Sequence, residues 1–281
     1  EDESDDGLLT PPAEDDWREV EKAHRLLREL WRSSPDVVSN IIPQMEAEVG
    51  AENVQLRTMA VQTVGDMISG IGAVGPPPPP EMDPAAYPSQ SLDTARTIRQ
   101  YDNILRAPAA PHSFSSVYST AYQGFVDRHR DKNAQVRSAW ATAAGHIIET
   151  GAGGKGMDVA QEMQLLRYMA ELLNDVDERV RLATINALAR FDFNMIMQKL
   201  GSLGGAESPG SILSHLCDRI KDPKKSVHYA AVELLGRIWG VAAGAIIEGS
   251  ERTRDLLGCI PSQILNAVWV NNRELNALVY Q

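Results

Sequence analysis

Cysteine is almost absent: Cys217 and Cys259 are the only two among 281 residues. Two cysteines in apolar surroundings offer neither a disulfide framework nor a metal-ligand pair, which points to a reducing compartment. Long apolar runs are missing too, since the longest, at 238–247, has ten residues and a membrane span needs about 20. The acidic start of the chain does not resemble a signal peptide. We therefore expect no membrane association.

A basic excess is also lacking, because the net charge is −11. Residues 1–16 hold eight acids and no base, and the remaining 30 acids and 27 bases nearly cancel. This balance argues against a general nucleic-acid binder and leaves direct DNA binding as a secondary alternative. We expect residues 1–16 to be an acidic disordered linker that ends at Trp17, with an acidic interaction tail as the alternative.

Catalytic patterns are missing as well. The histidines show no metal-ligand spacing, no Gly-x-Ser-x-Gly is present, and neither cysteine has the flanking pattern of a catalytic thiol. GAGGKG at 151–156 formally matches G-x-G-x-x-G, but a predicted helix precedes it where a phosphate loop needs a strand. We expect a helix-ending glycine turn there. We therefore predict no enzyme activity, metal or cofactor.

What the chain does contain is one 18-residue pattern that occurs four times, starting at residues 51, 131, 175 and 222. Aligned on a shared Leu or Val, the copies lie 80, 44 and 47 residues apart. A period of about 40–47 residues is typical of HEAT and armadillo helical pairs. The β-strand signal is weak throughout. The sequence thus predicts an all-α solenoid of stacked antiparallel helix pairs, with about four to five pairs in 17–281.

Each copy carries the apolar stripe of one buried helix face. The copy should be the second helix of a pair whose first helix lies upstream, at 37–49, 114–126, 159–173 and 212–220. Nine positions after the aligned Leu or Val, each copy has a small residue, which should let a neighbouring helix approach closely. These residues are Gly65, Gly145, Ala189 and Gly236.

A basic residue follows each aligned Leu or Val: Arg57, Arg137, Arg181 and His228. We favour a ladder in which these side chains pair with turn aspartates of the same or the next repeat, over an anion or ligand site. The aspartates are Asp131, Asp175 and Asp222, which we place at helix starts. Other bases cluster in the turns and could form a stripe for an acidic partner or an inositol phosphate, with solubilising charge as the favoured alternative. They are Arg128, His129, Arg130, Lys132, Lys221, Lys224 and Lys225.

The long first interval contains an insertion at about 70–111 with five consecutive prolines. We expect an exposed spacer, with a ligand for a proline-binding domain as the alternative. Within the insertion we expect a short helix at 91–106, and we expect a second loop at 201–210.

The amino-acid sequence of the first copy and its preceding helix is more specific than a generic helical repeat. DVVSNIIPQMEAEVGAENVQLRTMAVQTVGDMISG, residues 36–70, closely resembles a segment of the cohesin-associated Pds (precocious dissociation of sisters) family. The shared motifs are Pro43-Gln44-Met45-Glu46, then Ala51-Glu52-Asn53-Val54-Gln55-Leu56-Arg57, then Gly65-Asp66-Met67. Residues 125–140 and 260–279 also resemble this family, and the proline-rich insertion and glycine loop resemble its fungal branch. The resemblance covers roughly residues 17–281.

This resemblance implies an internal fragment of a nuclear, chromatin-bound regulator of sister chromatid cohesion. Its partners would be the kleisin subunit of cohesin, a releasing factor of the wings-apart type and the cohesin acetyltransferase. The family has no catalytic motif that could be carried over. A nuclear transport receptor or vesicle-coat scaffold is the alternative from another class.

We expect the stacked helices to present a preformed groove for an extended peptide, and the resemblance implies that this peptide is the N-terminal kleisin region. Candidate contacts are aromatic and basic residues near the helix turns, expected to be exposed, although Tyr118 and Tyr122 could instead belong to the core. They are Tyr118, Tyr122, Arg137, Arg181, Lys224, Lys225 and Tyr229.

Overall fold

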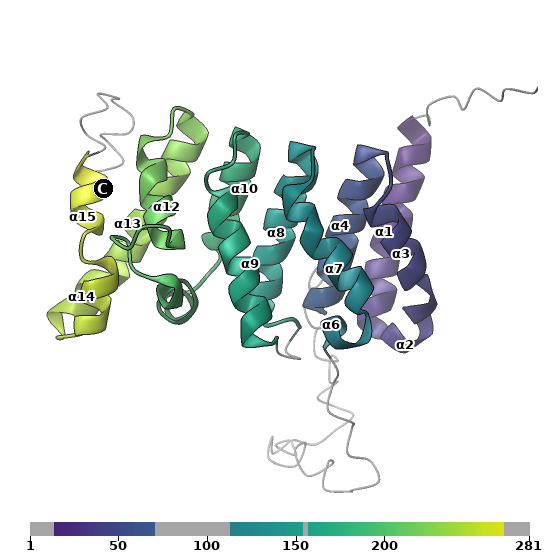
Figure 1. Ribbon diagram of the computed structural model, residues 1–281, viewed down its shortest axis with the longest axis horizontal. Coiled ribbons are helices and arrows are strands. Elements are labelled where there is room, and N and C mark those ends of the chain that lie inside the picture. Colours follow the sequence, from purple (N-terminus) through teal and green to yellow (C-terminus); the bar gives the residue numbers. More distant parts are fainter. Residues whose placement is uncertain (1–13, 71–112, 154–156, 267–281) are drawn as a thin grey trace, which may run out of the picture.

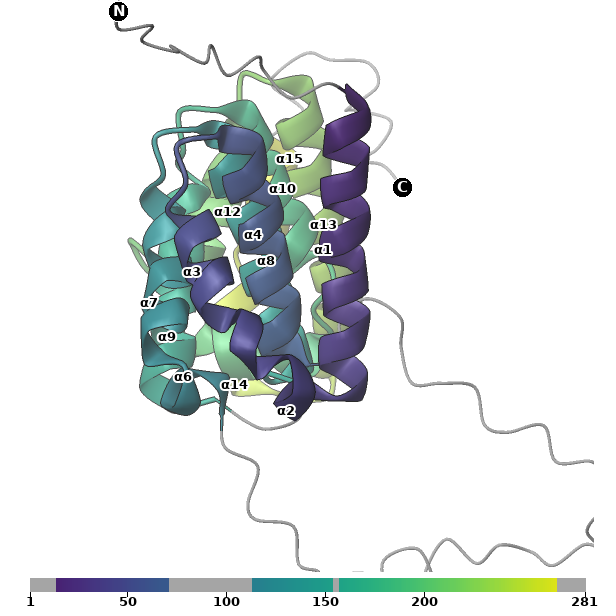
Figure 2. The same ribbon diagram turned by 90° about the vertical axis from the view of Figure 1, so that its right-hand side faces the viewer.

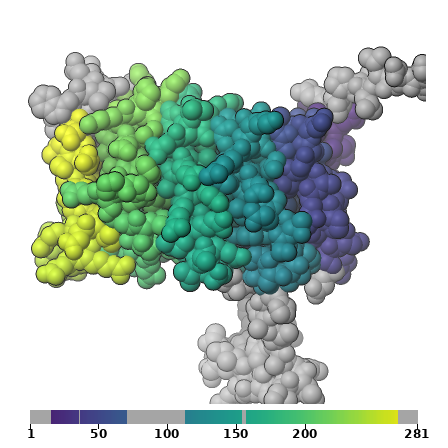
Figure 3. Space-filling view, in the orientation of Figure 1, coloured from purple at the N-terminus to yellow at the C-terminus, as the bar shows by residue number. Residues whose placement is uncertain are grey.

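The computed structural model describes residues 14–70, 113–153 and 157–266. Every regular element within these ranges is a helix, and antiparallel helix pairs stack side by side along one axis (Figure 1). The predicted all-α solenoid is confirmed. In the space-filling view the successive pairs touch along the whole stack (Figure 3).

The helices form two layers, which separate clearly when the stack is viewed along its axis (Figure 2). The first layer holds the leading helix of each pair: α3 (Ile42–Val49), α7 (Ser119–Asp127), α9 (Val159–Leu172) and α12 (Ile212–Asp218). The second layer holds the repeated pattern itself: α4 (Val54–Ser69), α8 (Ala134–Thr150), α10 (Glu178–Leu188) and α13 (Lys225–Ile247). Short helices complete the stack: α2 (Pro35–Val38), α6 (Phe114–Val117), α11 (Phe193–Met195), α14 (Glu251–Leu257) and α15 (Ile260–Asn266).

Burial follows the repeated stripe and joins the pairs into one core. α4 packs on α8, and α8 packs on α10, through the predicted small residues. A Cβ built on Gly65 would lie 2.5 Å from the Cβ of Ala143, and one on Gly145 would lie 2.7 Å from that of Ala187. Such a close approach leaves no room for a side chain, so the expected role of the small residues is confirmed at these two positions.

The N-terminal helix α1 (Glu14–Ser33) starts three residues before the expected end of the linker at Trp17. The expectation of disorder up to residue 16 is therefore wrong for residues 14–16, while residues 1–13 lie outside the described part. α1 lies on the outer side of α4 (Figure 2). The buried Trp31 anchors it, because its indole N–H donates to the Met67 carbonyl at 3.0 Å. The predicted insertion and the short helix at 91–106 also fall outside the described residues.

The loop expected at 201–210 is only partly irregular. A single π-helical turn at Ile196–Leu200 runs into a 3-10 turn at Gly201–Leu203 before the chain becomes irregular. The irregular part is fixed to α14, because the Ala206 N–H donates to the Leu256 carbonyl at 2.8 Å.

Among the described residues, α13 is the one helix long and apolar enough to cross a membrane by length and composition. A core helix of a stack passes the same test, and α13 packs against α10, α12, α14 and α15. We therefore assign it to the stack. Two of its large apolar side chains, Val241 and Ile247, remain exposed.

Candidate functional site

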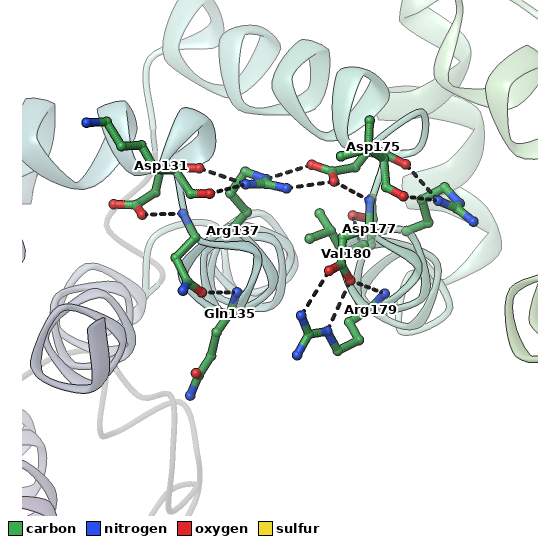
Figure 4. A network of polar contacts seen from close by, with 12 residues as sticks. Asp131, Gln135, Arg137, Asp175, Asp177, Arg179 and Val180 are labelled. Carbon is green, nitrogen blue, oxygen red and sulfur yellow. Dashed lines mark hydrogen bonds and ion pairs between the residues drawn. The ribbon is translucent and has the colours of Figure 1, made fainter. Parts of the chain in front are cut away.

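A ladder of arginine and aspartate side chains links consecutive helix pairs at one edge of the stack (Figure 4). Arg137 on α8 donates from Nε and Nη2 to the two carboxylate oxygens of Asp175, at 2.7 and 2.8 Å. Arg181 on α10 binds Asp222 in the same way, at 2.7 and 2.8 Å. The rung from Arg57 on α4 to Asp131 is slightly longer, with both distances at 3.1 Å. Each arginine thus reaches the turn of the next repeat.

The third guanidinium nitrogen of each arginine, Nη1, is used within its own turn. In Arg137 it donates to the carbonyls of Asp131 and Lys132, at 2.8 and 3.3 Å. In Arg181 it donates to those of Asp175 and Val176, at 2.7 and 3.2 Å. Because all three nitrogens are engaged, these arginines have little capacity left for a ligand. The ladder hypothesis is confirmed for the three arginines, and the ligand-site alternative has no support.

The aspartates do not cap the following helices, contrary to our expectation. Asp131 and Asp175 accept the N–H two residues onward, each at 2.8 Å, while facing an arginine. The capping role passes to Asn133 and Asp177, whose side chains accept the N–H groups of Gln135 and Arg179. The aspartate side chain therefore fixes the turn and the rung at the same time.

These contacts favour the ionised form of the Asp131 and Asp222 carboxylates. Burial by itself raises the pKa of Asp131, but the Asn133 N–H and the Arg57 guanidinium outweigh it and bring the pKa below its usual value. Burial also opposes the lowering at Asp222, where Arg181 and the Lys224 N–H prevail and the pKa falls. The same kind of contact affects an arginine of the ladder, because the hydrogen bond to Asp175 raises the pKa of Arg137.

The fourth copy does not extend the ladder. His228 is buried on α13 and forms no ion pair with an aspartate within the described ranges. An imidazole lacks the forked donors that let arginine bind a carboxylate and a turn at once. The predicted ladder is therefore wrong at this position.

The predicted partner contacts separate into buried and surface residues. Tyr122 is buried, and burial raises the pKa of its hydroxyl to about 12, so the core alternative holds for this residue. Arg181 is buried and Arg137 is nearly so, with both committed to the ladder. The expectation that these three are exposed is wrong.

The remaining candidates reach the surface. Lys224 and Lys225 are exposed at the start of α13, and Tyr229 is partly exposed one turn later. Tyr118 is partly exposed and packs against Trp31 and Phe114, with ring centroids 5.9 and 5.1 Å away.

Several of the basic residues near the turns are paired with acids. Arg130 pairs with Glu171 at 3.2 Å, and Lys224 pairs with Glu178 at 3.0 Å. Arg128 and Arg219 each add a contact of 3.3 Å to a ladder aspartate. This neutralisation favours local turn structure over a continuous basic stripe.

The glycine motif ends α8, as expected. Gly151 adopts a left-handed conformation with φ of 58°, and its N–H reaches the last carbonyls of the helix. Residues 154–156 of the motif lie outside the described part. Burial raises the pKa of the Cys217 thiol to about 12, which is unfavourable for a nucleophile. The described residues contain no cluster of three potential metal ligands.

Two features escaped the sequence analysis. The first is the docking of α1, where buried His24 lies 2.9 Å from the Thr63 hydroxyl and Arg28 pairs with Asp66 at 3.0 Å. The apolar spacing of α1 could have indicated this helix.

The second feature is an open pocket of about 250 Å³ on the second layer. It had no signal in the sequence, because its walls come from segments far apart. It is lined by Phe191, Phe193, Ile196, Arg237, Ile238 and Val241.

The chain is similar to known proteins over most of its length. The family model described as "Sister chromatid cohesion protein PDS5 protein" matches residues 6–281. The sister chromatid cohesion protein pds5 of Schizosaccharomyces pombe is 24% identical over 257 residues, covering 92% of this chain and 17% of that protein. PDS5 of Saccharomyces cerevisiae is 18% identical over 262 residues, covering 92% and 16%. The chain thus spans about a sixth of the length of these relatives.

A solved structure described as "Structure of the Pds5-Scc1 complex and implications for cohesin function" has the same fold. The TM-score is 0.65 at 18% identity, and the match covers 94% of this chain and 32% of that chain. At this identity the match shows the fold alone.

Proposed function

The chain belongs to the PDS5 family of sister chromatid cohesion proteins, and on this premise we propose that it is a non-enzymatic segment of a cohesin regulator that binds kleisin. The observation that carries the proposal is the family match over residues 6–281, together with the stacked helix pairs of the described part. The relative of known structure is described in complex with Scc1, a kleisin. A rigid stack offers a preformed surface, which lowers the ordering cost of binding an extended peptide.

We propose the surface candidates as contacts: Lys224, Lys225 and Tyr229 at the start of α13, and Tyr118 on the first layer. The ladder fixes the turn that carries Lys224, because Asp222 accepts the Lys224 N–H at 3.0 Å and binds Arg181. Arg137 and Arg181 would therefore support the surface without touching the partner.

The finer parts of the proposal rest on the family. They are control of sister chromatid cohesion and of cohesin release, a nuclear and chromatin-associated location, and cooperation with the wings-apart-type releasing factor and the cohesin acetyltransferase. Family membership favours this function over the transport or coat scaffold, which no observation supports.

Calorimetric titration of the chain with an N-terminal kleisin fragment tests the proposal. We expect saturable binding with Kd in the micromolar range, about −8 kcal/mol. A Lys224→Glu/Lys225→Glu variant should weaken binding, whereas Arg167→Glu, an exposed charge reversal on α9, should not. No heat of binding with both partners at roughly 50 μM would overturn the proposed function for this segment.

A further inference from the structure

The C-terminal half of α13 presents apolar surface that no described element covers. Val241 is 54% exposed and Ile247 is 86% exposed, on a helix whose other face lies in the core. Contiguous exposed apolar surface on a soluble protein often marks an interaction site. The surface also has a hollow, because Val241 lines the pocket found on the second layer.

The pocket has apolar walls and one charged side chain. Phe191, Phe193 and Ile196 enter from the segment after α10, and Ile238 and Val241 enter from α13. Its volume of about 250 Å³ lies below the roughly 300–1,000 Å³ of sites for small molecules and cofactors. A space of this size fits a single large apolar side chain.

Arg237 in the pocket and Arg252 on α14 have no acidic partner among the described residues. Arg237 lines the pocket and donates to the Ala189 carbonyl. Arg252 donates at 3.2 Å to the carbonyl of Met197, next to the lining residue Ile196. Neither forms an ion pair with a described residue. The acid between the two phenylalanines, Asp192, is occupied, since it accepts the Met195 N–H at 2.7 Å.

The pocket lies on a strip that starts at the proposed contact surface. Along α13, residues one turn apart lead from the basic edge to the pocket, and all are at least partly exposed. They are Lys225, Tyr229, Glu233, Arg237 and Val241.

From these observations we propose that the pocket holds a large apolar anchor of the partner peptide, and that an acidic residue beside this anchor pairs with Arg237. The inference rests on the proposed function, because it assigns part of the kleisin path to α13. Apolar anchors in pockets dominate the energy of most peptide interfaces. The charge pair would set the register of the peptide and its rate of association.

Two exposed positions allow a test that leaves the core intact. Val241→Gln puts a polar side chain on the pocket wall, and Arg237→Glu reverses the charge. Each has a matched control on α9, which carries none of the proposed contacts: Val159→Gln, where Val159 is 75% exposed, and Arg167→Glu. The affinity of each variant for the same N-terminal kleisin fragment is measured by calorimetry, and its folding is checked by its thermal midpoint. Val241→Ala serves as a second pocket variant if Val241→Gln unfolds early.

We expect both pocket variants to weaken binding about ten-fold or more, while both controls stay within about two-fold of the unmodified chain. Added salt should shrink the effect of Arg237→Glu, because screening weakens a charge contact at the surface. Equal affinity of all variants would refute the proposal that the pocket binds the peptide, and it would leave the proposed function intact. Failure of the unmodified chain to bind would instead remove the proposed function, and the inference with it.

Discussion

At the scale of single residues, two arginines on the same turn of α10 have opposite surroundings. Arg181 points into the ladder, where its side chain is 7% exposed and that of Asp222 is 0% exposed. Arg179, two residues earlier, is 69% exposed and binds Asp177 within its own turn at 2.9 Å. Helix periodicity explains this, because residues two apart lie on different sides of a helix.

Arg181→Ala should therefore lower the free energy of unfolding by about 3–5 kcal/mol, because it leaves a buried carboxylate without its partner. Arg179→Ala removes a surface contact and should leave stability almost unchanged. Urea denaturation of the two variants measures the difference. Similar losses of stability in both variants would show that the buried ladder contact stabilises the fold no more than the surface contact does.

The ladder was predictable at this scale because a basic residue and an aspartate recur with the repeat. The sequence could not say which aspartate each arginine meets, since the same-repeat and next-repeat turns are equivalent in the pattern. It also did not distinguish the residue that caps each helix from the aspartate two positions before it. Asp131 and Asp175 each accept the N–H two residues onward, and the helix caps are Asn133 and Asp177.

At the scale of elements, one position of the repeat shows how helix packing decides the effect of a residue. Gly145 and Gly236 both occupy the small position of their copies. Gly145 is in contact range of Ala187 on the next helix, while a Cβ on Gly236 would meet nothing within 4 Å.

Gly236→Ala should raise the free energy of unfolding by up to about 1 kcal/mol, because alanine is the better helix former and has space here. Gly145→Ala should lower it, because crowding against a packed neighbour costs about 1–3 kcal/mol and exceeds that gain. Thermal unfolding monitored by circular dichroism compares the two. A shift in the same direction for both would contradict the role given to the helix contact.

Elements with a long apolar period were predictable, and elements made by tertiary contacts were not. Most of the leading and repeated helices lie close to their expected ranges. The single helices expected at 37–49 and 114–126 are divided, so that α3 begins at Ile42 and α7 at Ser119, and α13 continues to Ile247 beyond its repeat. α1 was missed because its apolar residues do not belong to the repeated pattern. Its docking also depends on polar contacts, such as that of His24 with Thr63. The π-helical turn at Ile196–Leu200 has no periodic signal, and with it the pocket beside Arg237 escaped prediction.

At the scale of the whole molecule, the rungs connect the stack in series. Each rung joins the second helix of one pair to the turn of the next, from α4 to the start of α13. In a solenoid each repeat depends on its neighbours for stability. Loss of the rungs should therefore weaken every junction between described pairs.

Acid should cause this loss. The folded pKa of Asp131 and Asp222 is lowered, so their contribution is complete above the unfolded pKa of about 3.9. It disappears as the pH falls through the lower, folded pKa, because the protonated form is then common to both states. The chain should lose stability steeply below about pH 4.

Asp222→Asn separates this effect from general acid denaturation. The amide cannot ionise, so the variant should be less stable than the unmodified chain at pH 7, and the gap should close in acid. Asp218→Asn is the control, since Asp218 is 61% exposed on the neighbouring helix. Urea midpoints measured between neutral pH and strongly acidic pH give both curves. A gap that stays constant with pH would mean that the Asp222 carboxylate stabilises the stack by shape rather than by charge, and the electrostatic account of the ladder would fail.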